Sequence, residues 1–225
     1  TLQAAQASLQ SLSGQLHAAS AAMTFEAIDA SSRALADRFD DLLGRNTGYG
    51  MWTQSLNVGG GMGRSGYDSV GFQLNGWLVG SDRKIGSSGV AGFAFGQNQG
   101  QQQLDQAYDR NRSRSTEGML YAGWINGNWY AQGRLGVGHF QQSVNRRLLL
   151  GSSLQGVSTD YSGNYNVAYG ETGLHLNLAG SRITPFASVE YASIDRDGFA
   201  EQGAGGFGLR TNAQMLDRWR AGLGL

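Results

Sequence analysis

The sequence contains no cysteine and a single proline, and its 17 basic and 17 acidic residues cancel to a formal net charge of zero. Without cysteine, the chain has neither a disulfide framework nor a thiolate metal site. The balanced charge removes the strongest reason to expect nucleic acid as a partner. No run of about 18 apolar residues is present, so the sequence predicts no transmembrane helix.

Glycine, in contrast, is abundant: 36 of the 225 residues are glycine, against roughly 7% in average proteins. The glycines follow no G-X-Y period, which excludes collagen. They are scattered among aromatic residues, which argues against a disordered glycine-rich tract. Glycine mixed with aromatics in alternating strands is typical of large β-barrels, where small residues permit strand tilt and close backbone approach.

The first 43 residues are rich in alanine, glutamine, serine and leucine. Their apolar residues recur at mixed helical spacings, which predicts helix, with possible breaks at Gly14 and between Ser20 and Thr24. The stripe is too irregular for coiled-coil heptads. Residues 44–48 end the helix. A helix of about 40 residues would be about 60 Å long, twice the hydrocarbon thickness of a bilayer.

From Thr47 onward the apolar period changes to two, which predicts about eight strands, each close to the length that crosses a bilayer when tilted. Short turns are expected near Ile85, Ile125 and Leu178. Long polar connections are expected at residues 59–61, 97–114, 146–163 and 195–208. Short turns at one end and long loops at the other are typical of a transmembrane β-barrel.

Five charged residues lie in mid-strand on the polar faces: Arg134, Glu171, Glu190, Arg218 and Arg220. They would be costly in the dry core of a soluble β-sandwich, whereas a wet or helix-filled lumen accommodates them. We expect them to face the lumen and to hold the helix by charge-assisted hydrogen bonds. The expected pore-helix residues are Ala27, Asp29, Arg33, Asp37 and Arg38. The alternative is a water-filled lumen in which the five wall charges pair with one another.

Familiar catalytic and ligand-binding motifs are weak or missing. Two G-x-G-x-x-G matches, at residues 61–66 and 203–208, lie in loops between strands rather than between a strand and a helix, so they are attributed to chance. No G-x-S-x-G elbow is present, and the three histidines have no metal-ligand spacing. The carboxylates of residues 195–201 lack the spacing of a calcium loop and indicate a solvated turn.

The segment Ala22-Met23-Thr24-Phe25-Glu26-Ala27-Ile28-Asp29, followed by Arg33, Leu35 and a glycine–aromatic first strand, resembles the translocator β-domain of bacterial autotransporters (type V secretion). Further agreement comes from Gly66-Tyr67-Asp68, Gly80-Ser81-Asp82 and Pro185-Phe186-Ala187. The resemblance extends over nearly the whole chain. It implies an all-β transmembrane β-barrel of twelve strands with an N-terminal α-helix in the pore.

On this resemblance, residues 1–46 would be linker and pore helix, and residues 47–225 an outer-membrane β-barrel. The implied function is export of a covalently attached N-terminal passenger to the cell surface, with the helix plugging and tethering the pore afterwards. The implied partners are that passenger, outer-membrane lipid and the β-barrel assembly machinery. No cofactor, metal or nucleic acid is expected, and the domain is not expected to be an enzyme.

One departure from the family pattern concerns the C-terminus, which reads Ala221-Gly222-Leu223-Gly224-Leu225 after about eight strands rather than ending in an aromatic residue. We therefore expect the C-terminal hairpins to be missing from this sequence. We also expect the helix half near Gly44 to lie in the pore and Thr1 to about Ser20 to project beyond it. The alternatives are a small-barrel outer-membrane enzyme or adhesin with functional loops, and a soluble β-rich binding domain with a coiled coil.

Overall fold

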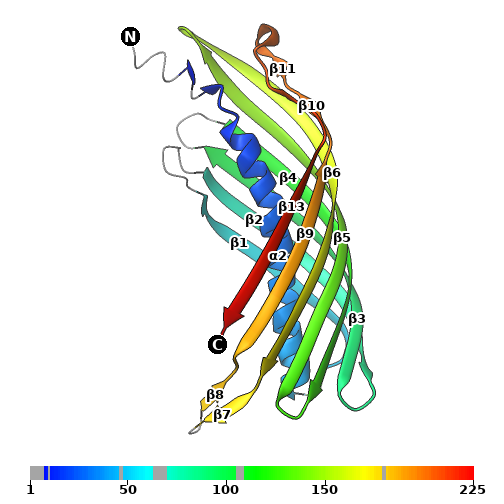
Figure 1. Ribbon diagram of the computed structural model, residues 1–225. Coiled ribbons are helices and arrows are strands. Elements are labelled where there is room, and N and C mark those ends of the chain that lie inside the picture. Colours follow the sequence, from blue (N-terminus) through cyan, green and yellow to red (C-terminus); the bar gives the residue numbers. More distant parts are fainter. Residues whose placement is uncertain (1–7, 10, 46–47, 63–69, 105–108, 179–180) are drawn as a thin grey trace.

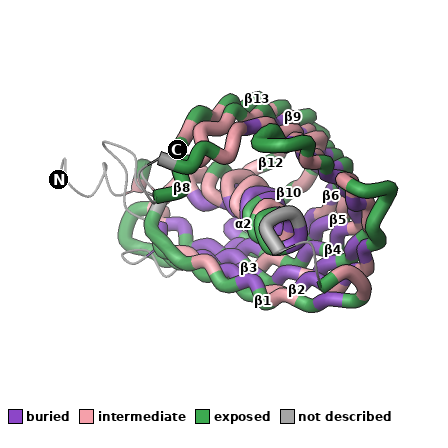
Figure 2. Tube along the Cα trace, turned by 90° about the horizontal axis from the view of Figure 1, so that it is seen from below, coloured by how far each residue is buried: buried purple, intermediate pink, exposed green. Residues whose placement is uncertain are grey.

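A computed structural model describes residues 8–9, 11–45, 48–62, 70–104, 109–178 and 181–225. It consists of one long helix, α2 (Gln15–Arg45), and an antiparallel sheet that curves around it (Figures 1 and 2). The helix begins directly after Gly14, whose φ of 67° lies in the left-handed region that favours glycine. The break expected at Gly14 is therefore confirmed, whereas α2 runs without interruption through Ser20–Thr24.

The main sheet has the strand order β1-β2-β3-β4-β5-β6-β9-β13, and β11 adds a short pairing to β6. These eight strands along the sheet agree with the number expected. Two further two-stranded sheets join β7 to β8 and β10 to β12. The bounds are β1 Gly50–Met62, β2 Val70–Ile85, β3 Gly89–Leu104, β4 Asp109–Asn126, β5 Trp129–Leu150, β6 Ser153–Leu174, β7 Leu176–Leu178, β8 Ser181–Ile183, β9 Phe186–Arg196, β10 Phe199–Ala200, β11 Gln202–Gly203, β12 Arg210–Thr211 and β13 Gln214–Gly224.

Two short turns are where they were expected, at residues 86–88 and 127–128. The third, at residues 179–180, lies outside the described residues, and the strands on either side of it, β7 and β8, are paired. Three of the expected long connections are wrong. Residues 59–61 belong to β1, β3 and β4 occupy most of 97–114, and β5 and β6 occupy nearly all of 146–163. Beyond the lipid, the outer face of a strand meets polar surroundings, and the inner face mixes polar residues such as Gln142 with apolar ones such as Val144 and Leu148. The apolar alternation then disappears from the sequence while the backbone hydrogen bonding continues.

The inner face of the sheet packs on α2. Helix residues including Ala27, Leu35 and Phe39 are buried in one apolar cluster with wall residues such as Leu78 and Tyr121. The fit is close: a Cβ at Gly123 would lie 2.5 Å from the Phe39 ring. Glycine at this position therefore allows the helix to approach the wall.

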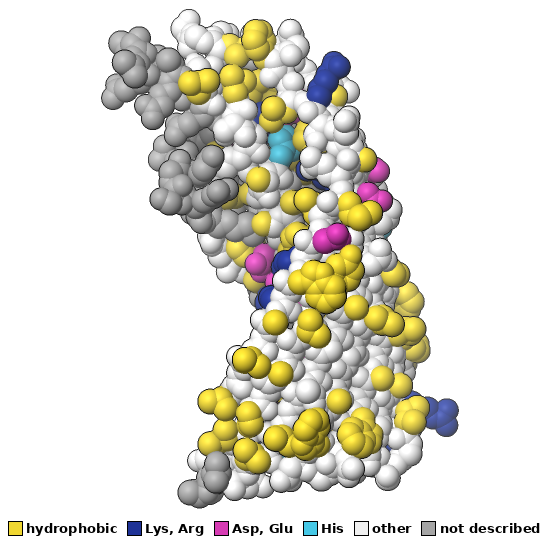
Figure 3. All heavy atoms as spheres, viewed as in Figure 1, with side chains coloured by type: hydrophobic (Ala, Val, Ile, Leu, Met, Phe, Trp, Pro, Cys, Tyr) yellow, Lys and Arg dark blue, Asp and Glu magenta, His cyan; other side chains and the backbone are white. Residues whose placement is uncertain are grey.

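The outer face carries a band of exposed apolar side chains in the lower half of the molecule (Figure 3). Neighbouring strands contribute to it at matched heights, since Leu120 of β4 is opposite both Phe93 of β3 and Leu135 of β5. Exposed apolar residues on the outside and charged residues within are the reverse of a soluble barrel and fit a lipid-facing wall. Within the described residues, no helix is long and apolar enough to span a membrane.

The N-terminal turns of α2 do not project beyond the wall, which corrects part of the expectation for Thr1 to Ser20. Leu16 is 1% exposed and Ser20 is fully buried. The reason is the length of β5 and β6, each of 22 residues. At a rise of about 3.3 Å per residue and a tilt near 40°, such strands reach about 55 Å, twice the height of a typical apolar band. The wall therefore surrounds the upper helix as well; Thr1–Ala7 lie outside the described residues.

If the outer face contacts lipid, a charged side chain introduced there should destabilise the barrel more the closer it lies to the bilayer midplane. Replacing Leu135, which is 62% exposed on the outer face, with Arg should destabilise the folded barrel by about 2–4 kcal/mol. Gln141→Arg, six residues higher on the same face of β5, is the matched control and should cost less than about 1 kcal/mol. Urea titration of the complete protein in lipid vesicles measures both. Equal effects at the two positions would contradict the assignment.

Candidate functional site

The charged contacts between α2 and β13 form the centre of the candidate site. Strand alternation places Arg218 and Arg220 on the same inward face of β13. Both donate to the Asp29 carboxylate on α2, Arg220 from Nη1 to Oδ2 at 2.7 Å and Arg218 from both Nη atoms. Asp29 is only 4% exposed. A carboxylate buried this deeply requires cationic partners, and the sheet supplies two.

Glu190 of β9 extends this contact because it is directly opposite Arg220 in the strand register. It accepts hydrogen bonds from Arg218 Nη2 at 2.8 Å and from Ser32 Oγ at 2.6 Å. Its carboxylate therefore bridges the helix and the wall. Arg220 Nη2 lies 3.5 Å from the same carboxylate.

Arg134 of β5 contacts the helix at the same Ser32. Its guanidinium donates to Ser32 Oγ at 2.8 Å and to the Ile28 carbonyl at 3.0 Å. Nη1 also donates to Glu117 of β4 at 2.6 Å, and both side chains are 1% exposed. We call the connected set the central charge network; it comprises Asp29, Ser32, Glu117, Arg134, Glu190, Arg218 and Arg220.

A second contact joins the lower end of the helix to the wall. Arg38 donates to both carboxylate oxygens of Asp82 on β2, with Nε at 2.9 Å, and to the Gly48 carbonyl at 2.7 Å. The Gly50 N–H donates to Asp82 at 3.0 Å. Asp82 thus fixes both the helix and the start of β1.

Asp82 and Glu117 were both missed from the sequence. Asp82 contributed only to the family resemblance and was given no lumen role, whereas it lies within β2 with its side chain inward. Glu117 is on the inward face of β4 within a stretch that was expected to be connection and strand start. The alternation of side chains along the strand could have identified Glu117, because residues two apart share one face. Glu117 shares its face with Met119 and Tyr121, which are both buried.

The third contact is at the upper end, where Glu201, between β10 and β11, receives three donors. His17 Nε2 is 2.8 Å from its Oε1, Arg146 Nε donates at 2.8 Å, and the Leu209 N–H donates at 2.8 Å. Burial on its own raises the pKa of Glu201, but these hydrogen bonds outweigh it and lower the pKa to about 2. Glu201 is therefore ionised and connects the first turn of α2 to β5. We call His17, Arg146 and Glu201 the upper clamp.

Between the central charge network and the upper clamp lies a layer of buried amides and hydroxyls. Gln102 donates to the Ala19 carbonyl at 2.7 Å, and Gln142 donates to the Ser20 carbonyl at 2.9 Å. Ser20 Oγ also hydrogen-bonds to Tyr161 Oη. Polar wall residues therefore follow the helix along its upper half.

The remaining predicted residues do not touch the partners expected for them. Ala27 is buried in the apolar cluster. Arg33 and Asp37 are exposed, and no hydrogen bond or ion pair in the described part of the chain involves them. Glu171 accepts from Tyr130 at 3.0 Å, Gln132 at 2.7 Å and Tyr169 at 2.5 Å, so its hydrogen bonds are to the wall rather than to α2.

Metal and nucleotide sites receive no support within the described ranges. No group of three or more His, Asp or Glu residues there could hold a metal ion. Glu201, one of the carboxylates examined for calcium, belongs to the upper clamp, and Asp197 accepts from Ser162 Oγ at 2.5 Å. Residues 203–208 include a short 3-10 helix, Ala204–Gly206, and part of the other glycine motif, residues 63–66, lies outside the described residues.

Comparisons with known proteins agree with this architecture. Residues 48–225 match the model of the autotransporter beta-domain family. The chain is 30% identical over 126 residues to "Probable outer membrane protein PmpD" of Chlamydia trachomatis serovar D, covering 51% of this chain and 8% of that protein. The chain thus spans only a small part of that relative's length.

Among solved structures, the translocator domain of autotransporter NalP from Neisseria meningitidis matches with a TM-score of 0.67 and 16% identity, over 86% of this chain and 68% of that one. This likeness shows the barrel fold. Three findings agree on the family: the match over most of the chain, the fold, and the lipid-facing band. The chain belongs to the autotransporter β-domain family and is a translocator domain of the bacterial outer membrane.

Proposed function

We propose that this domain exports a covalently attached N-terminal passenger to the cell surface, and that α2 afterwards stays in the barrel as plug and tether. The observation that carries the proposal is a 31-residue helix joined to the inner wall at its lower end, its middle and its first turn. A segment that only passed through would not need three sets of matched polar partners. The proposal includes that the domain is not itself an enzyme.

The direction of the chain supports export of the N-terminal side. In bacterial barrels, short turns face the periplasm and longer loops face the exterior. The turns at 86–88 and 127–128 lie at the end where α2 finishes, while the longer connection 197–213 lies at the end where α2 begins (Figure 1). Residues preceding α2 therefore emerge on the outer side, as an exported passenger requires.

The energetics support a helix that stays in place. Removing one partner of a buried ion pair typically costs about 3–5 kcal/mol, because the other charge is left buried without compensation. Withdrawing α2 would remove Asp29 from Arg218 and Arg220 and leave Glu190 as their one carboxylate partner. It would also take the Ser32 hydroxyl and the Ile28 carbonyl away from Arg134, which is 3% exposed. Water entering the vacated lumen would offset part of this cost, but the helix-filled state keeps every one of these charges paired.

We also propose that strands beyond Leu225 close the sheet. In the described residues β1 pairs only with β2, and β13 pairs only with β9. The NalP domain, of which this chain covers 68%, is longer. Residues 1–46 would then be linker and pore helix, and the barrel would start at residue 47 and continue past Leu225. Outer-membrane lipid and the β-barrel assembly machinery are the further partners that this proposal implies.

Surface exposure of the segment before Thr1 tests the export proposal. An epitope placed there in the complete protein should be digested when intact cells are treated with an external protease. The same epitope placed in the 127–128 turn is the control and should be digested only after the outer membrane is broken. Protection of the first epitope in intact cells, with the barrel correctly folded, would contradict export.

Conductance tests the plug. Replacing Arg218 and Arg220 with Ala in the complete translocator should raise the single-channel conductance in planar bilayers, because Asp29 loses both guanidinium partners. Met215→Ala with Leu223→Ala, which alters exposed outward positions of the same strand, should leave the conductance unchanged. If the arginine variant conducts like the parent protein, these residues do not hold the plug.

The upper clamp predicts an acid transition. The lowered pKa of Glu201 means that its stabilising contribution is complete above its ordinary pKa near 4.5 and is lost as the pH falls from there through about 2. A nitroxide on Ala18→Cys, at an exposed position of α2, should become more mobile over that interval by electron paramagnetic resonance. In Glu201→Gln the label should be mobile already at pH 6. The same acid transition in both proteins would rule out Glu201 as its cause.

A further inference from the structure

The outward face of β4 changes character along its length. Toward the lower turn it presents Leu120, Ala122 and Trp124, and toward the upper end it presents Arg110, Arg112 and Arg114. All six are exposed, and they share one face because they are spaced by two. We call the three arginines the arginine ladder.

The ladder begins where the apolar band ends. Strands tilted by about 40° gain about 2.5 Å of height per residue. Arg114, ten positions before Trp124 in the sequence, is therefore about 25 Å above it, which is the height of a typical apolar band. Arg112 and Arg110 follow at steps of about 5 Å. The ladder thus lies on the outside of the barrel at the level of the outer-leaflet head groups.

Neighbouring strands surround the ladder with amides and hydroxyls. In the register, Gln99, Gln101 and Gln103 of β3 are opposite Arg114, Arg112 and Arg110, and Gln141, Ser143 and Asn145 of β5 are opposite them on the other side. A shallow hollow of about 260 Å³ opens here. Its lining includes Gln99, Gln101, Arg112, Arg114, Gln141 and Ser143.

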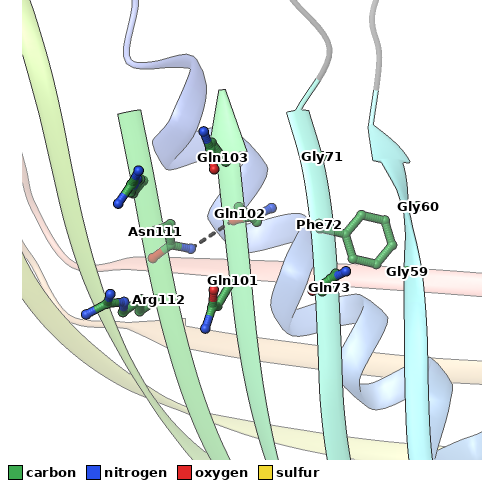
Figure 4. A pocket seen from close by; sticks show the side chains of 11 residues that line it. Gly59, Gly60, Gly71, Phe72, Gln73, Gln101, Gln102, Gln103, Asn111 and Arg112 are labelled. Atoms are coloured by element: carbon green, nitrogen blue, oxygen red, sulfur yellow. Dashed lines mark hydrogen bonds between the residues drawn. The ribbon is translucent and has the colours of Figure 1, made fainter. Parts of the chain in front are cut away.

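The close view of the adjoining hollow shows how these side chains are directed. Gln101, Gln103 and Arg112 point away from α2, which lies behind the sheet, whereas Gln102 and Asn111 hydrogen-bond to each other at 2.8 Å (Figure 4). The arginines are therefore presented to the surroundings of the barrel and not to its lumen.

The ladder carries positive charge with no counter-charge in the described structure. Among the described residues, no hydrogen bond or ion pair involves Arg110, Arg112 or Arg114. Asp109 is inward and buried, where it accepts from the Arg147 N–H at 2.8 Å. Asp160, the nearest outward carboxylate on β6, is paired in register with Ser143 and accepts its hydroxyl at 2.5 Å. Three like charges in a row on one strand create a positive potential that attracts anions from outside the chain.

We propose that the arginine ladder binds the phosphate groups of a phosphorylated glycolipid in the outer leaflet. Guanidinium groups bind phosphate through two parallel hydrogen bonds. The flanking glutamine, asparagine and serine side chains both donate and accept, which suits sugar hydroxyls. Same-face residues on a strand are about 7 Å apart, so neighbouring arginines can hold one phosphate jointly or two separately. This inference depends on the membrane orientation but not on passenger export.

Binding of lipopolysaccharide to the complete translocator in nanodiscs tests the inference. The variant Arg112→Gln/Arg114→Gln should bind phosphorylated lipopolysaccharide about 25-fold more weakly, taking roughly fivefold per lost arginine at the membrane surface. The matched control, Arg83→Gln/Arg210→Gln, removes the same charge from two exposed arginines elsewhere and should bind like the parent protein.

Two further arms identify the ligand. Dephosphorylated lipopolysaccharide should bind the parent protein as weakly as phosphorylated lipopolysaccharide binds the ladder variant. Inorganic phosphate at millimolar concentration should compete only weakly. Unchanged binding by the ladder variant, an equal loss in the control, equal affinity for the dephosphorylated lipid, or full competition by free phosphate would each overturn the proposal. Unchanged heat-modifiable migration on gels verifies that the variants fold.

Discussion

The structure depends on one constraint: charged side chains that face the inside of a barrel must be paired. Asp29 on the helix and Arg218 and Arg220 on the wall satisfy it together. Without the two arginines, Asp29 would be a buried charge with no cationic partner. Without Asp29, the two arginines would share the single carboxylate of Glu190. The helix and the sheet therefore stabilise each other, and the central charge network fixes the rotation of α2 inside the barrel.

Strand length is the second determinant. Because β5 and β6 continue well above the apolar band, the wall has two functionally different zones. The lower zone faces lipid outside and encloses the central charge network. The upper zone encloses the first turns of α2 with the buried amide layer and the upper clamp, and its outward face carries the arginine ladder. Because successive side chains point to opposite faces, each upper strand contacts α2 with one set of residues and faces the membrane surface with the other.

Much of this could be predicted from the sequence, because period two in the strands assigns faces directly. It separates inward Arg134 from outward Leu135 without any structure. The upper strands could not be recognised, since stretches such as Gln97–Leu104 have no apolar face. The helix contacts could not be derived either: Asp29, Arg33 and Asp37 are four residues apart and lie on one helical face, yet only Asp29 has a wall partner among the described residues. Which partner faces which residue depends on the rotation of the helix within the barrel.

Disulfide trapping tests most directly whether α2 occupies the barrel in the cell. A Cβ at Gly100 of β3 would lie 3.3 Å from Met23 Cγ on the helix, which suits a disulfide, and the parent chain has no cysteine. After export, oxidation of Met23→Cys/Gly100→Cys in the complete protein should give a cross-linked species, whereas Met23→Cys/Gly71→Cys, with its second cysteine on the outer face, should not. A cross-link in neither pair, or equal cross-linking in both, would contradict a helix held inside the barrel.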